Sequence, residues 1–302
     1  MRKLQLDKFI NTDIASIIDK YDYYFNGNCS KVDSPEMCVK IFSDGRLLNI
    51  SEDATYSICD FGKTKRIIKG TIDDVYTLTI ISDKKVMCAS NDNTIKIWNP
   101  NTGEIEKVLK GHSEYITCLE KLSDRQIISG SNDGSIRIWN LDTGTTEKIL
   151  IGHNKCITCL IKLPDGRIVS GSDDKTIIIW NNGKAEKILE GHTHLIRTIK
   201  ILPDGRIVSE SNDKTIRIWN SYTGETENIL KGHTGAPIGL GILPDGRIIS
   251  STFNDFLVIW SPDTGKIDKR IKTSMYSIID ITILKDNRLL CRFTDDSLWI
   301  YD

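Results

Sequence analysis

One pattern recurs through this chain at a nearly constant interval and limits what the chain can fold into. It consists of a Gly-His pair followed, 27 residues after the histidine, by a tryptophan. The four full copies run from His112 to Trp139, from His153 to Trp180, from His192 to Trp219 and from His233 to Trp260. Weaker copies end at Cys59, Trp98 and Tyr301, so that seven units fill the chain from residue 32 to its end. Self-similarity with a period of about 40 residues predicts a repeat architecture.

Each unit has the character of short strands separated by turns. Segments such as Thr176–Trp180 are β-branched and apolar, which is typical of buried strands. The Asp-Gly pairs at residues 165–166, 204–205 and 245–246 predict two-residue hairpin turns between apolar strands. Four-stranded sheets stacked around an axis would bury both of their apolar faces.

The recurring Gly-His and Trp positions resemble the signature of the WD40 repeat (beta-transducin-like) family. The resemblance implies an all-β fold, a single seven-bladed WD40 β-propeller over residues 21–302. In such propellers an N-terminal strand commonly completes the last blade. The last unit stops at Asp302, directly after Tyr301, and so lacks its fourth strand. Because an unpaired sheet edge invites aggregation, we expect residues 21–27 to pair with the last blade and close the ring.

Residues 1–20 precede the repeats and are expected to form an N-terminal extension. Ile10, Ile14, Ile17 and Ile18 recur at helical spacing, which predicts one short amphipathic helix there.

A set of polar residues recurs with the pattern and invites comparison with a Ser-His-Asp hydrolase. The sets are His112, Ser129, Asp133 and Trp139; His153, Ser170, Asp174 and Trp180; His192, Ser209, Asp213 and Trp219; and, with Asn254 in the Asp position, His233, Ser250 and Trp260. A catalytic triad occurs once per active site, whereas this set occurs in unit after unit. The family resemblance implies a structural network instead. In that network Asp accepts from His, His bonds the Ser hydroxyl, and Ser bonds the indole N–H.

The network is less complete in the outer units. The unit ending at Trp98 has Thr71 and Cys88 in the His and Ser positions, and the first and seventh units have lost both His and Trp. We therefore predict that the weakest blades flank the ring closure and that local opening begins there.

The sequence has no other signature of catalysis or cofactor binding. It contains no Gly-rich phosphate loop before a helix, no H-E-x-x-H and no paired Cys/His metal pattern. Cys156 and Cys159 lie three residues apart in an expected strand, so they should point to opposite faces, which suits neither a metal nor a disulfide. We therefore expect a protein that is not an enzyme and that uses no cofactor and no metal.

Composition narrows the range of partners. The 302 residues include 40 basic and 41 acidic side chains, well mixed, with a net charge of −1, which argues against nucleic acid and anionic membranes as partners. There is no apolar run of membrane-spanning length and no signal peptide. The eight cysteines occupy different positions in different units, as reduced buried thiols do, which predicts an intracellular protein, cytoplasmic or nuclear.

The resemblance also implies where a partner would bind. In WD40 propellers the most used rim carries the residues three and five positions after the repeat histidine and the residue before the repeat Asp. Carried over unit by unit, these positions supply a partner-binding hypothesis of Met37, Tyr76, Tyr115, Arg197, Ile238, Phe253 and Ile279. Aromatic, Met and Ile side chains beside the acidic Glu52 and Asp74 predict a site for a peptide or helix with apolar anchors and some basic character. The alternative is that these apolar residues pack under loops or under the N-terminal segment.

We therefore expect a non-catalytic scaffold that binds a protein or peptide partner on this rim, monomeric by itself and part of a larger complex. One alternative is a substrate-recognition subunit of a ubiquitin ligase, although residues 1–20 are too short for an adaptor-binding domain. An enzyme is the alternative from another class, and nothing in the sequence supports it. A structural subunit of a fixed assembly would show a large apolar side surface.

Overall fold

The β-strands expected from the repeats are present throughout the computed structural model. It describes residues 36–42, 46–51, 56–60, 63–66, 75–252, 256–272, 278–283, 289–293 and 298–301. Every regular element in these ranges is a strand, which confirms the all-β prediction. The predicted helix in residues 1–20 and the predicted closing strand 21–27 lie outside the described residues. No described segment forms a helix long and apolar enough to cross a membrane.

The strands form seven antiparallel sheets, named blades 1 to 7 in chain order. Blades 1 to 3 comprise β1 (Glu36–Ile41), β2 (Leu47–Ser51), β3 (Tyr56–Asp60) and β4 (Lys63–Arg66); β5 (Val75–Ser82), β6 (Lys85–Ser90), β7 (Ile95–Trp98) and β8 (Ile105–Leu109); and β9 (Ile116–Lys121), β10 (Gln126–Ser131), β11 (Ile136–Asn140) and β12 (Thr146–Leu150). Blades 4 and 5 comprise β13 (Ile157–Lys162), β14 (Ile168–Ser172), β15 (Ile177–Asn181) and β16 (Lys184–Leu189); and β17 (Ile196–Ile201), β18 (Ile207–Ser211), β19 (Thr215–Trp219) and β20 (Thr226–Lys231). Blades 6 and 7 comprise β21 (Pro237–Ile242), β22 (Ile248–Thr252), β23 (Phe256–Trp260) and β24 (Ile267–Lys272); and β25 (Ile278–Ile283), β26 (Leu289–Phe293) and β27 (Leu298–Tyr301).

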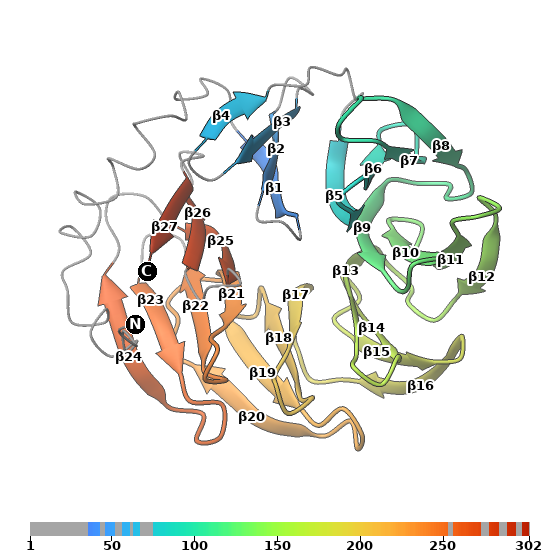
Figure 1. Cartoon of the computed structure of the whole chain (residues 1–302). Coiled ribbons are helices and arrows are strands. Elements are labelled where there is room, and N and C mark those ends of the chain that lie inside the picture. Colours follow the sequence, from blue (N-terminus) through green and yellow to red (C-terminus); the bar gives the residue numbers. More distant parts are fainter. Residues whose placement is uncertain are drawn as a thin grey trace.

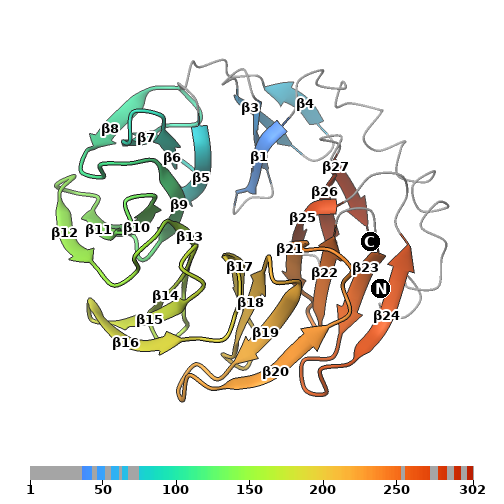
Figure 2. The same ribbon diagram turned by 180° about the vertical axis from the view of Figure 1, so that it is seen from behind.

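The blades follow one another around a common axis (Figure 1), and the view from behind shows the same circular order (Figure 2). The first strand of each blade lies nearest the axis and the fourth lies at the circumference. Because consecutive strands are antiparallel, their turns alternate between the two ends of the propeller. The end that carries the Gly-His segments and the repeat Asp residues is called here the histidine rim, and the other end the opposite rim.

The repeat tryptophans lie between blades and join them. Trp180 of blade 4 is 2 % exposed and packs in one apolar cluster with Ile136 and Leu150 of blade 3. Trp219 stands in the same relation to Ile177 and Leu189 of blade 4. Burying a side chain of this size contributes several kcal/mol, about 3 to 5 for an aromatic residue in a packed core. The cores therefore lie between successive sheets, and each blade depends on its neighbour.

Hydrogen bonds between innermost strands supplement this packing at intervals of one repeat. Thr79 Oγ1 donates to the carbonyl of Leu119, 2.8 Å away and 40 residues later, and Thr117 Oγ1 donates in the same way to Ile157. At the other end of the strand, Lys121 Nζ donates to the carbonyl of Ile81 at 2.9 Å.

The Asp-Gly turns differ from the two-residue hairpins expected from the sequence. In blade 4 the Gly166 N–H donates to the Leu163 carbonyl at 3.0 Å, and the Leu163 N–H donates to the Arg167 carbonyl at 2.8 Å. Gly166 has a φ of +93°. This is a three-residue loop, in which a type I turn over Pro164 and Asp165 is followed by a glycine in the left-handed region. The prediction was wrong because a two-residue loop over Asp165 and Gly166 would require Pro164 to donate an N–H to the Arg167 carbonyl, and proline has no N–H.

Candidate interaction rim

The recurring polar residues form a hydrogen-bonded chain beneath the histidine rim. In blade 4, His153 Nδ1 lies 2.8 Å from Asp174 Oδ2, and His153 Nε2 lies 2.8 Å from Ser170 Oγ. Trp180 Nε1 donates to the same Ser170 Oγ at 2.8 Å. Blade 3 repeats these contacts at 2.9, 2.7 and 2.8 Å through His112, Asp133, Ser129 and Trp139, and blade 5 repeats them at 2.8, 2.7 and 2.7 Å through His192, Asp213, Ser209 and Trp219.

The hydrogen bonds of this network all run in one direction, from the indole to the carboxylate. The indole N–H donates to the serine oxygen, which leaves the serine O–H to donate to His Nε2 and the Nδ1–H to donate to the carboxylate. Such an arrangement requires a neutral imidazole. Burial lowers the pKa of His153 and outweighs the opposing effect of Asp174, which agrees with the neutral form. The serine hydroxyl and both imidazole nitrogens of the network therefore take part in hydrogen bonds.

The aspartate is held by more groups than the histidine alone. Burial by itself would raise the pKa of Asp133, but hydrogen bonds from Ser135 and His112 lower it to about 2. Ser135 donates both its hydroxyl, at 2.6 Å, and its N–H, at 2.8 Å, to Asp133 Oδ1. Ser113 donates its N–H to Oδ2 at 3.1 Å. The carboxylate thereby ties the Gly-His segment to the turn between the second and third strands.

Two recurring hydroxyls were not singled out from the sequence. Thr176 Oγ1 donates to Asp174 Oδ1 at 2.7 Å, and Ser172 Oγ accepts the Asp174 N–H at 3.1 Å while it bonds the Lys155 carbonyl at 3.3 Å. The equivalent residues are Ser131 and Ser135 in blade 3 and Ser211 and Thr215 in blade 5. The signal was available, because a hydroxyl residue stands two positions before and two positions after each of these aspartates.

Blades 2 and 6 contain altered versions of this hydrogen-bond network. In blade 6, His233 Nε2 and Trp260 Nε1 both lie near Ser250 Oγ, at 2.6 and 2.7 Å, while Asn254 is outside the described residues. In blade 2 the Cys88 thiol takes the serine position and lies 3.7 Å from the Lys96 carbonyl. Burial raises the pKa of Cys88 to about 12, so it stays a thiol at neutral pH.

The protein should lose stability as the pH falls below about 6.5. An unfolded histidine takes up a proton near pH 6.5, whereas burial lowers the pKa of His112, His153 and His192 in the folded state. Below pH 6.5 the unfolded state binds more protons, so the stability that is fully present above that pH is lost progressively. A further loss is expected between pH 3.8 and about 2, where Asp133 takes up its proton. Urea midpoints at pH 7.5, 6.5 and 5.5 measure the first step.

A substitution in the network tests the cause of this loss. His153→Gln should reduce the pH dependence, because it removes one of the buried histidines. A urea midpoint that is constant from pH 7.5 to 5.5 in the wild-type protein would contradict the prediction.

Each candidate residue five positions after the repeat histidine occupies one specific place in the sheet. It is the residue that the pairing between the first and second strands skips, so that it forms a β-bulge. The seven bulge residues are Met37, Tyr76, Thr117, Thr158, Arg197, Ile238 and Ile279. Bulges re-aim side chains and recur next to functional sites. The structure therefore brings these residues to equivalent positions at one end of the propeller.

The described side chains of this group differ in exposure. Tyr115 is 45 % exposed, and its carbonyl accepts the Asn132 N–H at 2.8 Å, which joins the two rim turns of blade 3. Arg197 is exposed, and its Nη1 donates to Asn212 Oδ1 at 3.1 Å. Ile238 is half-buried. The side chains of Met37, Tyr76 and Ile279, and the whole of Phe253, lie outside what the structure describes, so the apolar character of the rim stays a prediction.

Apolar side chains are exposed at the circumference of the propeller. The fourth strands, at the circumference, expose Val108, Ile149, Ile188 and Ile229, one from each of blades 2 to 5. These positions are equivalent in the repeat.

The cysteines of the C-x-x-C sequence form no disulfide with each other. Cys156 and Cys159 are both free, and burial raises the pKa of Cys159 to about 12 and that of Cys156 to about 11. In the described part of the chain no three His, Cys, Asp or Glu side chains gather as a metal would require.

The chain is similar to known proteins both in its sequence repeats and in its fold. A family model described as "WD domain, G-beta repeat" matches residues 62–99, 103–140, 144–181 and 183–220. No curated protein sequence matches the chain. Among solved structures, the WD40 beta propeller domain of Doa1 is similar, with 23 % sequence identity and a TM-score of 0.73. The similarity covers 89 % of this chain and 93 % of the Doa1 domain.

Proposed function

The chain belongs to the WD40 repeat family, and from that premise we propose that it is a non-catalytic scaffold that binds a peptide or protein partner on its histidine rim. The family is generally one of protein–protein interaction scaffolds, which gives the role its coarse outline. The location of the site and the kind of partner are the proposal.

The proposal rests on one observation: the blades share the same hydrogen-bond network but carry different residues at the bulge position above it. The same His, Asp, Ser and Trp contacts recur in blades 3, 4 and 5 within 0.1 Å. The bulge residues held above them differ from blade to blade, from threonine in blades 3 and 4 to Arg197 in blade 5 and Ile238 in blade 6. A rigid frame with different side chains at equivalent positions suits recognition of an extended, asymmetric partner, because little ordering entropy is lost on binding.

Burial of the network argues against its use in catalysis. The side chains of His112 and His153 have no exposed surface, and Ser129 and Ser170 are likewise fully buried. A serine nucleophile must be reachable by its substrate and must keep an oxygen lone pair free for attack. Here each serine hydroxyl lies beneath the turns and also accepts an indole N–H. These residues stabilise the rim rather than react.

We place the protein in the cytoplasm or nucleus, a proposal supported by its thiols. Cys88, Cys118, Cys156, Cys159 and Cys291 are free, and burial raises the pKa of several of them, which suits a reducing compartment.

The rim proposal can be tested by affinity capture from a lysate of the source cells. The test variant is Tyr115→Ala combined with Arg197→Ala, and the matched control is Tyr222→Ala, which removes a 70 % exposed tyrosine from the opposite rim. We expect a partner that the wild-type protein and the control capture equally and that the test variant captures at least about tenfold less, as when anchor residues are removed. The wild-type protein and the test variant should unfold at the same temperature.

Other outcomes would favour a different binding surface or a different role for the protein. If every partner survives the double substitution, the rim proposal is wrong. Partners that instead depend on Ile149 and Ile188 would favour a structural subunit that contacts its neighbours through the exposed circumference. The identity of a rim partner would also distinguish a general scaffold from a substrate-recognition subunit of a ubiquitin ligase.

A further inference from the structure

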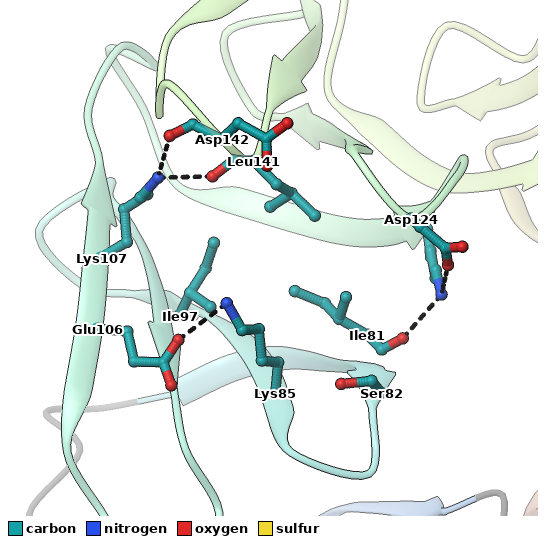
Figure 3. Close-up of a pocket in the computed structure, with 10 residues that line it drawn as sticks. Ile81, Ser82, Lys85, Ile97, Glu106, Lys107, Asp124, Leu141 and Asp142 are labelled. Carbon is teal, nitrogen blue, oxygen red and sulfur yellow. Dashed lines mark hydrogen bonds and ion pairs between the residues drawn. The ribbon is translucent and has the colours of Figure 1, made fainter.

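A pocket lies on the opposite rim, between blades 2 and 3. It has a volume of about 370 Å³, and its lining includes Ile81, Lys85, Ile97, Glu106, Leu141 and Asp142 (Figure 3). This space is called here the junction pocket. We infer that it is a receptor for an arginine side chain presented by a partner protein. The inference concerns a site separate from the histidine rim and is independent of the proposal above.

Two other junctions show what fills this place elsewhere in the ring. Arg206, which precedes the second strand of blade 5, donates from Nη2 to Asp263 Oδ1 of blade 6 at 2.7 Å. Its Nη1 lies 3.5 Å from Glu227 Oε2 of its own blade. Asp204 of its own turn also holds the guanidinium, 2.7 Å from Nε and 2.6 Å from Nη2. One guanidinium therefore bridges carboxylates of its own blade and a carboxylate on the next blade's turn.

The junction of blades 4 and 5 is filled in the same way. Arg167 Nη1 lies 3.3 Å from Glu186 Oε1 and donates to the Ser221 carbonyl at 2.7 Å. Its guanidinium stacks on Tyr222, 5.0 Å from the ring centroid. Arg167 has a buried position between the blades. An internal arginine thus occupies this space in both of these junctions.

Blade 2 keeps the acceptors but lacks the arginine. The residue equivalent to Arg206 is Lys85, whose Nζ forms an ion pair with Glu106 of the same blade at 3.1 Å. Glu106 corresponds to Glu227, and Asp142 on the blade 3 turn corresponds to Asp263. Lysine offers a single charged point where arginine offers a planar fork, so it does not bridge two carboxylates in the same way.

The turn that would receive the guanidinium is held in place. Lys107 Nζ donates to the carbonyl oxygens of both Leu141 and Asp142, at 2.5 and 2.8 Å. The Asp142 carboxylate is then left with one loose contact, 3.6 Å from Nε of the largely exposed Arg125. The backbone of the turn is therefore fixed before binding, which limits the entropy lost when a ligand enters.

The walls suit the whole arginine side chain and not only its charge. Ile81 and Ile97 are buried and apolar and would contact the methylene stem, while Glu106 and Asp142 stand where the fork would reach. Arginine buries its stem and keeps its head polar, and its fork matches carboxylates in pairs. The volume also exceeds that of one side chain, which leaves room for the backbone that carries it.

The pocket has equal numbers of basic and acidic side chains, so we expect the shape of the ligand's cationic group to decide which ligand binds. Lys85, Lys107 and Lys121 face Glu106, Asp124 and Asp142. Lys121 is held by Asp124 at 2.8 Å and by the Ile81 carbonyl at 2.9 Å. Because no net negative charge would draw in any cation, discrimination of arginine from lysine rests on the fork.

The next junction supplies a contrast within the same chain. Between blades 3 and 4 the equivalent residue is Gln126, which bonds Glu147 at 2.5 Å, and the facing turn of blade 4 is the shorter Asn182-Gly183 without an acid. This junction offers only one of the two carboxylates.

The test uses the full chain and the peptide acetyl-Gly-Arg-Gly-amide, with lysine and citrulline versions of the same peptide. Backbone amide NMR signals of residues 106 and 141–143 report on binding. We expect saturable shifts with the arginine peptide, a Kd at least about fivefold higher for the lysine peptide, and no shifts with the uncharged citrulline peptide.

Two variants and a control sharpen the test. Lys85→Arg should fill the pocket from within, abolish peptide binding and raise the Tm by about 1–3 °C, while it keeps the charge unchanged. Asp142→Asn should weaken the arginine peptide at least about fivefold. Gln126→Arg places the same group one junction away and should leave binding unchanged. Equal binding of the arginine and lysine peptides, binding that persists in Lys85→Arg, or no shift at millimolar arginine peptide would each overturn the inference.

Discussion

Replacing Ser170 with alanine should lower the free energy of unfolding by about 3 kcal/mol, because two buried groups lose their partner at once and each unsatisfied group costs about 1–3 kcal/mol. Ser170 Oγ accepts from Trp180 Nε1 and lies at hydrogen-bond distance from His153 Nε2, both at 2.8 Å. Neither group can turn to water, since both side chains are buried. Urea unfolding, followed by tryptophan fluorescence, measures the change.

The chain itself suggests the control for this experiment. Blade 2 has Cys88 in the serine position, so Ser170→Cys should be much less harmful than Ser170→Ala. Alanine at the exposed Ser123 should change stability by less than about 0.5 kcal/mol. A loss below about 1 kcal/mol for Ser170→Ala would mean that the serine does not hold the chain of hydrogen bonds together.

Gly171→Ala should destabilise the protein by about 2–3 kcal/mol, although it adds only one methyl group, because a close-packed junction has no room for it. A Cβ on Gly171 would stand 2.6 Å from Ile196 Cγ2 of blade 5 and 2.7 Å from Cys159 Sγ. Both distances are far inside van der Waals contact, so blades 4 and 5 would have to separate. The change in Tm and in the urea midpoint measures the effect.

A double-mutant cycle tests the cause of that loss. Ile196→Ala removes the methyl group that the new Cβ would strike, so Gly171→Ala should cost at least about 1 kcal/mol less in that background. Gly235→Ala is the matched control, because the nearest atom to its added Cβ is 3.9 Å away. If the two changes at residues 171 and 196 were additive, contact between the blades would not be the cause.

Much of the fold could be predicted because the informative residues recur. The spacing from His153 to Trp180, repeated in neighbouring units, indicated both the sheets and the buried hydrogen bonds. The predicted turn type was wrong because Pro164, which precedes the Asp-Gly pair, has no N–H to close a two-residue turn. The hydrogen bond of Thr176 to Asp174 was not predicted, because a threonine at the start of a predicted strand is equally explained by its strand propensity.

The sites depend on relations that a single unit does not contain. The bulge at Arg197 depends on the pairing of two strands, and the alternation of residues along one strand does not reveal a skipped position. The junction pocket depends on Lys85 and Asp142, which are far apart in the chain and meet only when two blades stack. Aligning the units does show lysine where Arg206 stands in blade 5, but the space it leaves is visible only in three dimensions.

The contacts that join each blade to its neighbour, such as Thr79 to Leu119 across 40 residues, set the order in which the chain can fold during synthesis. At about 5–20 residues per second, a ribosome releases one such interval in about 2–8 seconds. Each new blade then finds the finished face of the previous one within reach, so docking needs no distant segment. A nascent chain always ends in one uncovered apolar face, the one that the next tryptophan will cover. Translational pauses between blades would prolong that exposure and with it the demand for chaperones.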